Sequence, residues 1–291
     1  MNKKIRIGSR ESKLAVLQSQ IIIDLIKKHC PQYEIELVTM KTTGDRILDR
    51  TLDKVGGKGL FVKELDKALL NGEVDLTVHS LKDVPMEIDE RIPLVAFTEC
   101  EYPYDVLVLP KGTDKLDLSK PIGSSSMRRS IQIKKIYPDA EIKPIRGNVI
   151  TRLKKLDSGE YSALILAQAG LERLGLSYRI SRVFNENEII PAAGQGVIAV
   201  QGRKEDNFDF VKYINNKNSK LCAEAERSFV KELNGGCSSP VAAFAVLKND
   251  KITINGLYAE NNIMNIQSIT GKAGEGKALG KELAKRVREV L

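Results

Sequence analysis

The chain has 291 residues, of which 42% are hydrophobic and 29% charged, and its formal net charge is +8 at pH 7. This length allows two or three domains, and this composition excludes a largely disordered chain. No run approaches the roughly 20 apolar residues that a membrane span needs. The lysines near the N-terminus are followed by no apolar signal segment, so we expect a cytoplasmic protein.

The cysteine and histidine content restricts the chemistry. None of the four cysteines forms a C-x-x-C pair, and there are two histidines. This argues against a zinc ribbon, thioredoxin-type chemistry and a multi-histidine metal site, so we expect no metal. Disulfides are also not expected in a reducing compartment.

The basic excess fits nucleic acid, a membrane surface or acidic small molecules as partner. The chain has no Trp, only 5% aromatic residues and no long block of like charges. A base-stacking surface for single strands is therefore poorly supplied. Arginines recur singly or in pairs beside glycines and serines, a pattern that favours small carboxylates or phosphates.

The first hundred residues alternate between strand and helix patterns. We expect strands at 5–7, 34–40 and 74–78 and helices at 14–28 and 60–70. A loop at 9–12 would cap the first helix, and Asn71-Gly72 would end the second. This order predicts an α/β domain.

A second unit of the same kind follows. The patterns predict strands at 105–109, 121–123, 141–145, 163–167 and 197–200, and helices at 126–136, 149–156, 169–174 and 221–233. Residues 191–196 interrupt the alternation. The last portion predicts an antiparallel meander at 242–247, 252–258 and 266–270, with a turn at Asn249-Asp250 and a closing helix at 277–291. We interpret it as a small α+β domain.

The segment Gly56-Gly57-Lys58-Gly59 has two interpretations. It is not a Walker A loop, because no Ser or Thr follows the lysine. It is either a flexible turn before a helix or a lid that closes over a cleft, excludes water and brings lysines near an anion.

The segment from Gly123 to Arg129 is more specific. Three serine hydroxyls and several backbone N–H groups lie where a helix should begin, which favours an anion site. Two arginines follow within the first turn, and a capped helix with solvent-facing arginines is the alternative. Further arginines lie near the ends of other predicted strands, where side chains of an open α/β sheet converge on one crevice. These are Arg10, Arg146, Arg152 and Arg173.

Two more residues are candidates for chemistry. Asp83 lies just beyond a predicted strand. It is a candidate acid or base, and a role in a helix cap is the alternative. Cys237 follows two glycines directly after a helix, where another molecule can approach closely. We expect Cys30, Cys100 and Cys222 to be buried and inert, as is usual for cysteine.

Five segments together resemble the porphobilinogen deaminase (hydroxymethylbilane synthase) family in order and spacing along nearly the whole chain. They are residues 55–65, 78–85, 123–129, 146–149 and 235–237. Ser124 stands where the family commonly has Thr, and Ser238-Ser239 follow the cysteine where other residues are usual. Neither departure touches a charged or nucleophilic position.

The resemblance implies an α/β fold of three domains. The first two would resemble type II periplasmic binding proteins, and the chain would cross between them twice. Domain 1 would comprise residues 1–99 and 194–215, domain 2 residues 100–193, and domain 3, a small α+β domain with the cysteine loop, residues 216–291.

The implied activity is that of a transferase in porphyrin (haem) biosynthesis. It joins four porphobilinogen molecules head to tail with release of ammonia and yields the linear tetrapyrrole hydroxymethylbilane. Growth takes place on a dipyrromethane cofactor that is bound to the cysteine, here Cys237, through a thioether. The implied partner is the substrate porphobilinogen alone, without nucleic acid or membrane. We expect a monomer.

The resemblance also assigns site residues. Asp83 would be catalytic, stabilising the cationic azafulvene that forms when ammonia leaves. The cofactor would contact Cys237, Asp83, Lys82, Ser80, Ser125, Arg128, Arg129 and Arg146. The substrate would contact Arg10, Ser12, Gln18, Lys54, Lys58, Phe61, Ser126, Arg152, Arg173 and Gln195. The cofactor and four substrate rings together carry roughly a dozen negative charges, which require many paired cations.

Two other classes of protein share part of this pattern. A solute-binding protein would bind an anion in a cleft but would normally carry a signal segment and has no use for Cys237. A nucleic-acid-binding protein would explain the charge but not Asp83 or the cysteine. Release of ammonia from porphobilinogen distinguishes the enzyme from both.

Overall fold

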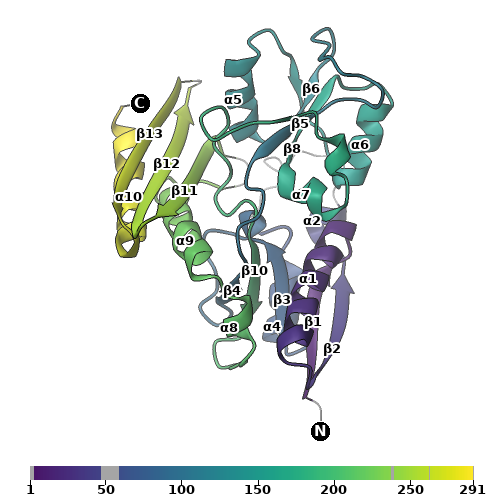
Figure 1. Cartoon of the computed structure of the whole chain (residues 1–291), viewed down its shortest axis with the longest axis vertical. Helices are drawn as coiled ribbons and strands as arrows, with labels where there is room; N and C mark the ends of the chain where they lie inside the picture. The colour runs from purple at the N-terminus through teal and green to yellow at the C-terminus, as the bar shows by residue number, and fades with distance from the viewer. Residues whose placement is uncertain (1–2, 47–58, 237–238, 262, 291) are drawn as a thin grey trace. The chain divides into compact units, whose positions relative to one another are not determined.

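The computed structural model describes residues 3–46, 59–236, 239–261 and 263–290 (Figure 1). The chain forms two compact units. Of the described residues, unit 1 contains 3–46, 59–101 and 197–220, and unit 2 contains 102–196 and those from 221 to 290. After Glu101 the chain therefore leaves unit 1, and at Val197 it returns to complete it.

Unit 1 is built on a five-stranded sheet of order β2-β1-β3-β10-β4. Its strands are β1 (Lys3–Arg10), β2 (Tyr33–Met40), β3 (Leu76–Ser80), β4 (Leu94–Phe97) and β10 (Ile198–Gly202). The first three are parallel, and β10 runs antiparallel between β3 and β4. The helices are α1 (Lys13–His29), α2 (Thr43–Arg46), α4 (Lys63–Leu70) and α8 (Val211–Ile214), with the 3-10 turn η1 (Leu81–Asp83).

Helices α1 and α4 cover opposite faces of this sheet. Successive side chains of a strand point to opposite faces. In β2, Leu37 packs in the cluster that contains Ile22 and Ile26 of α1. Its neighbour Val38 packs instead against Leu69 of α4. The sheet is therefore covered on both sides, and its strands β3 and β10 are buried along nearly their whole length.

Unit 2 contains a second five-stranded sheet, of order β7-β6-β8-β5-β9. Its strands are β5 (Asp105–Val108), β6 (Ile122–Gly123), β7 (Ile142–Lys143), β8 (Ala163–Ala167) and β9 (Arg182–Val183). Strand β6 is parallel to β7 and β8, and β5 is antiparallel to β8 and β9. The two sheets thus repeat one arrangement, in which a strand from a distant chain segment pairs antiparallel beside three parallel ones. The helical elements are α5 (Met127–Ile136), α6 (Val149–Asp157), α7 (Gln168–Arg173) and η2 (Ser177–Arg179).

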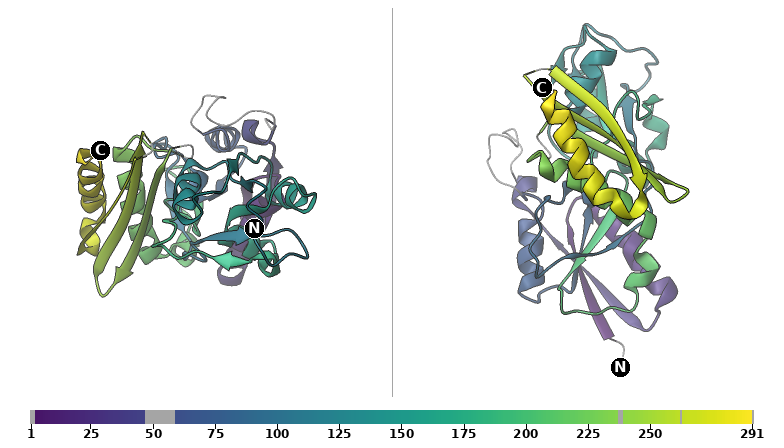
Figure 2. Two further views of the ribbon diagram at one scale, coloured as in Figure 1. Left: turned by 90° about the horizontal axis from the view of Figure 1, so that it is seen from above. Right: turned by 90° about the vertical axis from the view of Figure 1, so that its left-hand side faces the viewer.

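The C-terminal part of unit 2 is an antiparallel meander of β11 (Val241–Lys248), β12 (Lys251–Glu260) and β13 (Ile263–Lys272). Helix α9 (Lys217–Glu232) precedes it, and η3 (Ala273–Glu275) and α10 (Gly276–Glu289) follow. Figure 2 shows α10 lying along one face of this sheet. Asn249 and Asp250 form the β11–β12 turn with positive φ angles of 48° and 59°.

Gly280 allows α10 to lie against the backbone of α9. A Cβ at this position would stand 2.4 Å from the Ala225 carbonyl oxygen and 3.1 Å from the Phe229 nitrogen. Backbone atoms cannot move aside as a side chain can, so we expect Gly280→Ala to lower the free energy of unfolding by about 1–2 kcal/mol. This loss would outweigh the gain of about 1 kcal/mol that Ala brings to a helix. Urea denaturation measures the difference.

Gly274→Ala is the matched control, because an added Cβ there meets nothing within 4 Å. It should leave the free energy of unfolding nearly unchanged. A Gly280→Ala protein that is more stable than the wild type would show that α10 does not need this close approach.

The mixed α/β class and its three-sheet organisation, predicted from the sequence, are confirmed. Other expectations were wrong in detail. Strand β1 continues through Ser9 and Arg10, which we placed in a loop, and β3 continues through His79 and Ser80. Helix α4 begins three residues later than expected. Strands β4 and β9 were not predicted, because each is short and takes its place through pairing with distant segments.

Candidate functional site

Asp83 is presented at the end of a central strand of unit 1. The preceding strand β3 pairs with β1 and β10, and the Leu81 N–H donates to the Val197 carbonyl oxygen at 3.0 Å. Leu81 is fully buried, whereas Lys82 and Asp83 are half-buried. No hydrogen bond or ion pair joins the Asp83 carboxylate to another described residue. The sheet therefore fixes the backbone at Asp83 and leaves its carboxylate available.

Two predicted site residues, Gln18 and Ser80, lie in direct contact. The Gln18 amide nitrogen donates to the Ser80 hydroxyl at 2.9 Å. Gln18 is buried on α1, and its helix is capped by Ser12, whose hydroxyl accepts from the Ala15 N–H at 3.4 Å. Ser12 therefore has a structural role at the N-terminus of α1, and Gln18 orients the Ser80 hydroxyl.

Arg10 and Phe61, also predicted site residues, form a second contact in unit 1. The Arg10 guanidinium carbon lies 4.3 Å from the centroid of the Phe61 ring. The same guanidinium donates from Nε to Asp45 at 3.2 Å and forms an ion pair with it. Burial by itself would raise the pKa of Asp45, but the hydrogen bonds from Arg10 and Thr42 outweigh burial and lower this pKa. Arg10 is thus held in place at the end of β1.

His79 does not take part in this set. It is buried in β3, and its Nε2 lies within hydrogen-bond distance of the Thr77 hydroxyl (2.9 Å) and of Gln201 Oε1 (3.1 Å). Burial lowers its pKa to about 4, so the imidazole is neutral at physiological pH. Its contacts are those of a core residue.

The serine segment of unit 2 forms the start of α5. Ser126 is the N-cap, and its hydroxyl accepts from the Arg129 N–H at 3.4 Å. The Ser125 hydroxyl donates to the Ile145 carbonyl oxygen at 2.6 Å and accepts from the Ile145 N–H at 2.9 Å. This pair of bonds fixes the segment that leads to Arg146. The helix expected over 126–136 is confirmed.

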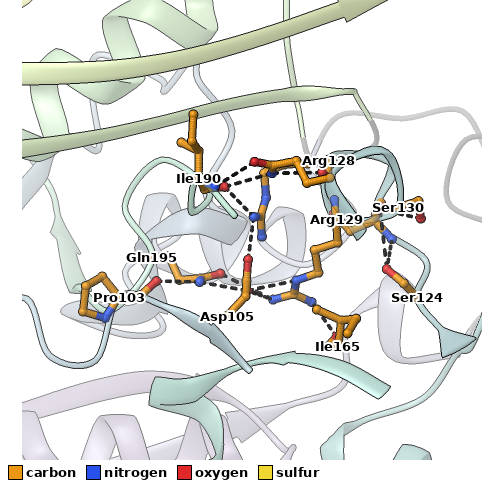
Figure 3. Close-up of polar contacts among 11 residues, drawn as sticks. Pro103, Asp105, Ser124, Arg128, Arg129, Ser130, Ile165, Ile190 and Gln195 are labelled. Carbon is orange, nitrogen blue, oxygen red and sulfur yellow. Dashed lines mark hydrogen bonds and ion pairs between the residues drawn. The ribbon is translucent and has the colours of Figure 1, made fainter. Parts of the chain in front are cut away.

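Arg128 and Arg129 point inward from α5 and meet at one carboxylate, that of Asp105 (Figure 3). The Arg128 Nη1 to Asp105 Oδ2 distance is 2.6 Å, and Arg129 donates to Oδ1 from Nε at 3.0 Å and from Nη2 at 2.7 Å. Gln195 adds its amide to Oδ1 at 3.0 Å and to the Pro103 carbonyl oxygen at 2.6 Å. The alternative of solvent-facing arginines is therefore wrong.

The charges in this cluster are strongly coupled. Asp105 has no exposed surface, and burial by itself would raise its pKa. The two guanidinium groups outweigh burial and hold the pKa of Asp105 well below its ordinary value. Burial lowers the pKa of Arg128. Among the groups in contact, two cations face one anion, which leaves an excess of one positive charge.

Two other predicted arginines of unit 2, Arg152 and Arg173, donate to backbone carbonyls. Arg152 Nε donates to the Gly147 oxygen at 2.8 Å, and Arg173 Nη2 donates to the Gly196 oxygen at 2.5 Å. Gly147 has a φ of 109°, which favours glycine directly after Arg146. Arg173 lies at the end of α7 rather than directly after a strand.

Three predicted site residues, Lys54, Lys58 and Cys237, lie outside the described residues, and so does most of the segment interpreted as a lid. Of the other cysteines, Cys30 is buried as expected, but Cys100 is exposed, which corrects our expectation. Cys222 is half-buried in the middle of α9, where burial raises the pKa of its thiol to about 12.

The sequence analysis missed two buried acids. Asp105 opens an otherwise apolar strand, and a charge at the edge of a buried strand was a signal that could have revealed it. Glu226 is buried on α9 and accepts from the N–H groups of Gly194 (2.7 Å) and Ala245 (2.8 Å). Burial raises its pKa to about 8. Glu226 thereby connects α9 and β11 to the segment that carries Gln195.

Unit 1 thus carries Asp83 and, separately, the contact between Arg10 and Phe61. Unit 2 carries the cluster of Arg128, Arg129 and Asp105, which has an excess positive charge. No group of three or more acidic, histidine or cysteine side chains in the described part of the chain has metal-binding geometry. No helix of that part is both long and apolar enough to cross a membrane.

Comparisons with known proteins give the family. Residues 5–209 match the family model described as "Porphobilinogen deaminase, dipyromethane cofactor binding domain", and residues 220–289 match "Porphobilinogen deaminase, C-terminal domain". A porphobilinogen deaminase of Acetivibrio thermocellus is 61% identical over 97% of this chain and 97% of its own length. One of Alkaliphilus oremlandii is 57% identical over 98% and 97%.

Among solved structures, the methionine-binding protein MetQ aligns with a TM-score of 0.45 and 12% identity over 72% of this chain and 88% of that chain. The family assignment rests on the sequence matches, which span nearly the whole chain at high identity. The chain therefore belongs to the porphobilinogen deaminase family.

Proposed function

We propose that this chain is a hydroxymethylbilane synthase, a transferase that condenses four porphobilinogen molecules head to tail and releases one ammonia at each step. The observation that carries this proposal is the Arg128–Arg129–Asp105 cluster, which holds one excess positive charge in a buried position. Each substrate ring carries two carboxylates. A buried cation without its own anion favours such a ligand, because the ligand completes the charge balance.

The cofactor implied by the family is a dipyrromethane, and the donors of the described site fit it. Arg128, Arg129 and Arg146 offer guanidinium groups to its acetates and propionates, together with Lys82, Ser80 and Ser125. Arg128 keeps donors for such a group, since both of its hydrogen bonds to described residues come from Nη1. When bound, the cofactor supplies the terminal pyrrole to which the first substrate is joined. Cys237 is the proposed attachment point.

Asp83 is the proposed catalytic residue. As ammonia leaves porphobilinogen, positive charge develops on the substrate pyrrole and its N–H becomes more acidic. A carboxylate in reach of that N–H stabilises the charge. Asp83 suits this role because it is half-buried, fixed by β3 and not paired with another described residue. It can also transfer a proton at the departing amine.

The remaining polar residues are proposed to bind and orient the substrate. The Gln18–Ser80 and Arg10–Phe61 contacts hold three of the substrate-contact side chains, Gln18, Arg10 and Phe61, in place. The proposed substrate contacts are Arg10, Ser12, Gln18, Lys54, Lys58, Phe61, Ser126, Arg152, Arg173 and Gln195. We further propose a cytoplasmic monomer that binds no nucleic acid. Its three domains would comprise residues 1–99 with 194–215, residues 100–193 and residues 216–291.

The activity is tested by incubating purified protein with porphobilinogen. We expect ammonia release and a linear tetrapyrrole product, with four ammonia molecules for each tetrapyrrole. Ammonia release without a tetrapyrrole, or binding of porphobilinogen without ammonia release, would contradict the proposed function. The second outcome would indicate a solute-binding protein.

Replacing Arg128 or Arg146 with Lys should impair function although the charge is kept. Lys offers a point charge where Arg offers a planar pair of donors. Loss of one charged hydrogen bond costs about 1.5–3 kcal/mol, or about ten- to a hundredfold in binding. Cofactor content by intact mass and kcat/KM for porphobilinogen measure the effect.

Arg182→Lys is the control, because Arg182 lies on the exposed strand β9 and pairs with Glu188. It should retain the kcat/KM of the wild type. If Arg128→Lys and Arg146→Lys also carry cofactor and turn over normally, these two arginines are not carboxylate ligands.

A further inference from the structure

Asp105 binds both arginines of the cluster through different oxygen atoms. Oδ2 accepts from Arg128, and Oδ1 accepts from Arg129 and from the Gln195 amide (Figure 3). As the first residue of β5, Asp105 is fixed by pairing with Ala167 of β8. The carboxylate is therefore anchored by the sheet and determines where the two guanidinium groups lie.

The two arginines differ in how many donors the protein already uses. Arg129 donates from Nε and Nη2 to Asp105 and from Nη1 to the Ile165 carbonyl oxygen at 3.2 Å. To residues that the structure describes, Arg128 donates only from Nη1, to Asp105 and to the Ile190 carbonyl oxygen at 2.7 Å. Some described side-chain nitrogens are fully buried and have no hydrogen-bond partner, but Nε and Nη2 of Arg128 do not belong to that group. These two nitrogens therefore retain contact with solvent. Arg128 is thus the member of the pair with donors to spare.

The charge balance indicates which kind of ligand these Arg128 donors would bind. The contacts of Arg128 include one anion, Asp105, which Arg129 shares. A second carboxylate beside Arg128 would neutralise the cluster, and its best geometry is a fork of two parallel bonds. That geometry requires the guanidinium plane to be fixed before the ligand arrives.

We propose that Asp105 is a positioning residue, which holds Arg128 through Nη1 so that its Nε and Nη2 receive one carboxylate of the bound pyrrole chain, while Arg129 and Gln195 hold Asp105. This role rests on the proposed function. It predicts that displacing the Asp105 carboxylate weakens carboxylate binding even when the total charge of the cluster is kept.

Two variants test the position of the Asp105 carboxylate. Asp105→Glu retains the anion and the total charge but moves the carboxylate by one methylene, and Asp105→Asn keeps the shape of the side chain but removes the anion. Each is expressed in cells that cannot make porphobilinogen, so that the chain is obtained without added mass. The rate at which it then acquires two pyrrole units from porphobilinogen is followed by intact mass, and thermal unfolding reports folding. We expect this rate to fall at least about tenfold in both variants, since a charged hydrogen bond is lost or misaligned.

Asp157→Asn is the matched control. Asp157 accepts two hydrogen bonds from the buried Arg179, at 2.7 and 3.1 Å, in the same unit. Its loss should lower stability but leave the rate of mass addition unchanged. Asp105→Asn introduced into Arg128→Lys should slow the reaction by less than about twofold, because Asp105 acts through Arg128.

Folded Asp105 variants that acquire the added mass at the wild-type rate would overturn the positioning role. So would an equal loss of rate in Asp157→Asn, which would make the effect one of stability alone. If the wild-type chain itself neither acquires mass nor releases ammonia, the proposed function fails instead, and the two outcomes are therefore distinguishable.

Discussion

Cys237→Ser is expected to lack any covalent addition and to be inactive. A thiolate is a strong nucleophile toward an electrophilic methylene carbon, whereas a serine hydroxyl at neutral pH is not. A thioether, once formed, resists the reductants of a cytoplasm and so serves as a permanent attachment. The wild-type protein should exceed its sequence mass by two linked pyrrole units, and peptide mapping should place this addition on Cys237. Intact mass and ammonia release are measured on both proteins.

The other cysteines provide the controls. Cys30 is buried, and the thiol of Cys222 has a pKa raised to about 12, so neither is an effective nucleophile at pH 7. Cys100 is exposed and is therefore the residue to compare. Cys100→Ser should keep both the added mass and the activity.

Two results would contradict the assignment. One is an unmodified wild-type protein with full activity, since nothing would then hold the growing chain between additions. The other is an added mass that disappears in Cys100→Ser and persists in Cys237→Ser, which would move the attachment point to the exposed thiol.

Asp83→Asn should fold and carry the cofactor but lose nearly all turnover. The substitution keeps the shape of the side chain and removes the negative charge that opposes the developing positive charge on the substrate. Removal of one such electrostatic group typically costs about a hundred- to a thousandfold in kcat. Loss of proton transfer at the amine would add to this cost. Single-turnover ammonia release, with cofactor content from intact mass, measures the effect.

Asp89→Asn is a suitable control, because Asp89 belongs to the same unit and its carboxylate pairs with Arg91 near the surface. It should retain normal turnover. Activity of Asp83→Asn within about tenfold of the wild type would remove Asp83 from the mechanism, because a charge-stabilising group is worth more than that.

The sequence by itself determined most of the elements and the family. Periodicity located β8 at Ala163–Ala167, and it located α5 and the three-stranded meander to within a few residues, because each has a strong local pattern. The segments around Asp83 and Arg128 gave the resemblance to the family. Local signals were sufficient here because caps, turns and apolar spacing depend on neighbouring residues.

The tertiary structure alone decided which side chains share a contact. The fold brings Gln18 into contact with Ser80, although the two are 62 positions apart in the sequence. Sheet pairing brings Asp105 of β5 beneath the arginines of α5. The sequence placed those arginines at an anion site, whereas the structure pairs them with the Asp105 carboxylate, which already occupies part of their hydrogen-bonding capacity. The pairing of β5 with β8 and the return of the chain at Val197 are long-range events. Their stability comes from burial and pairing between distant segments, which no local pattern encodes.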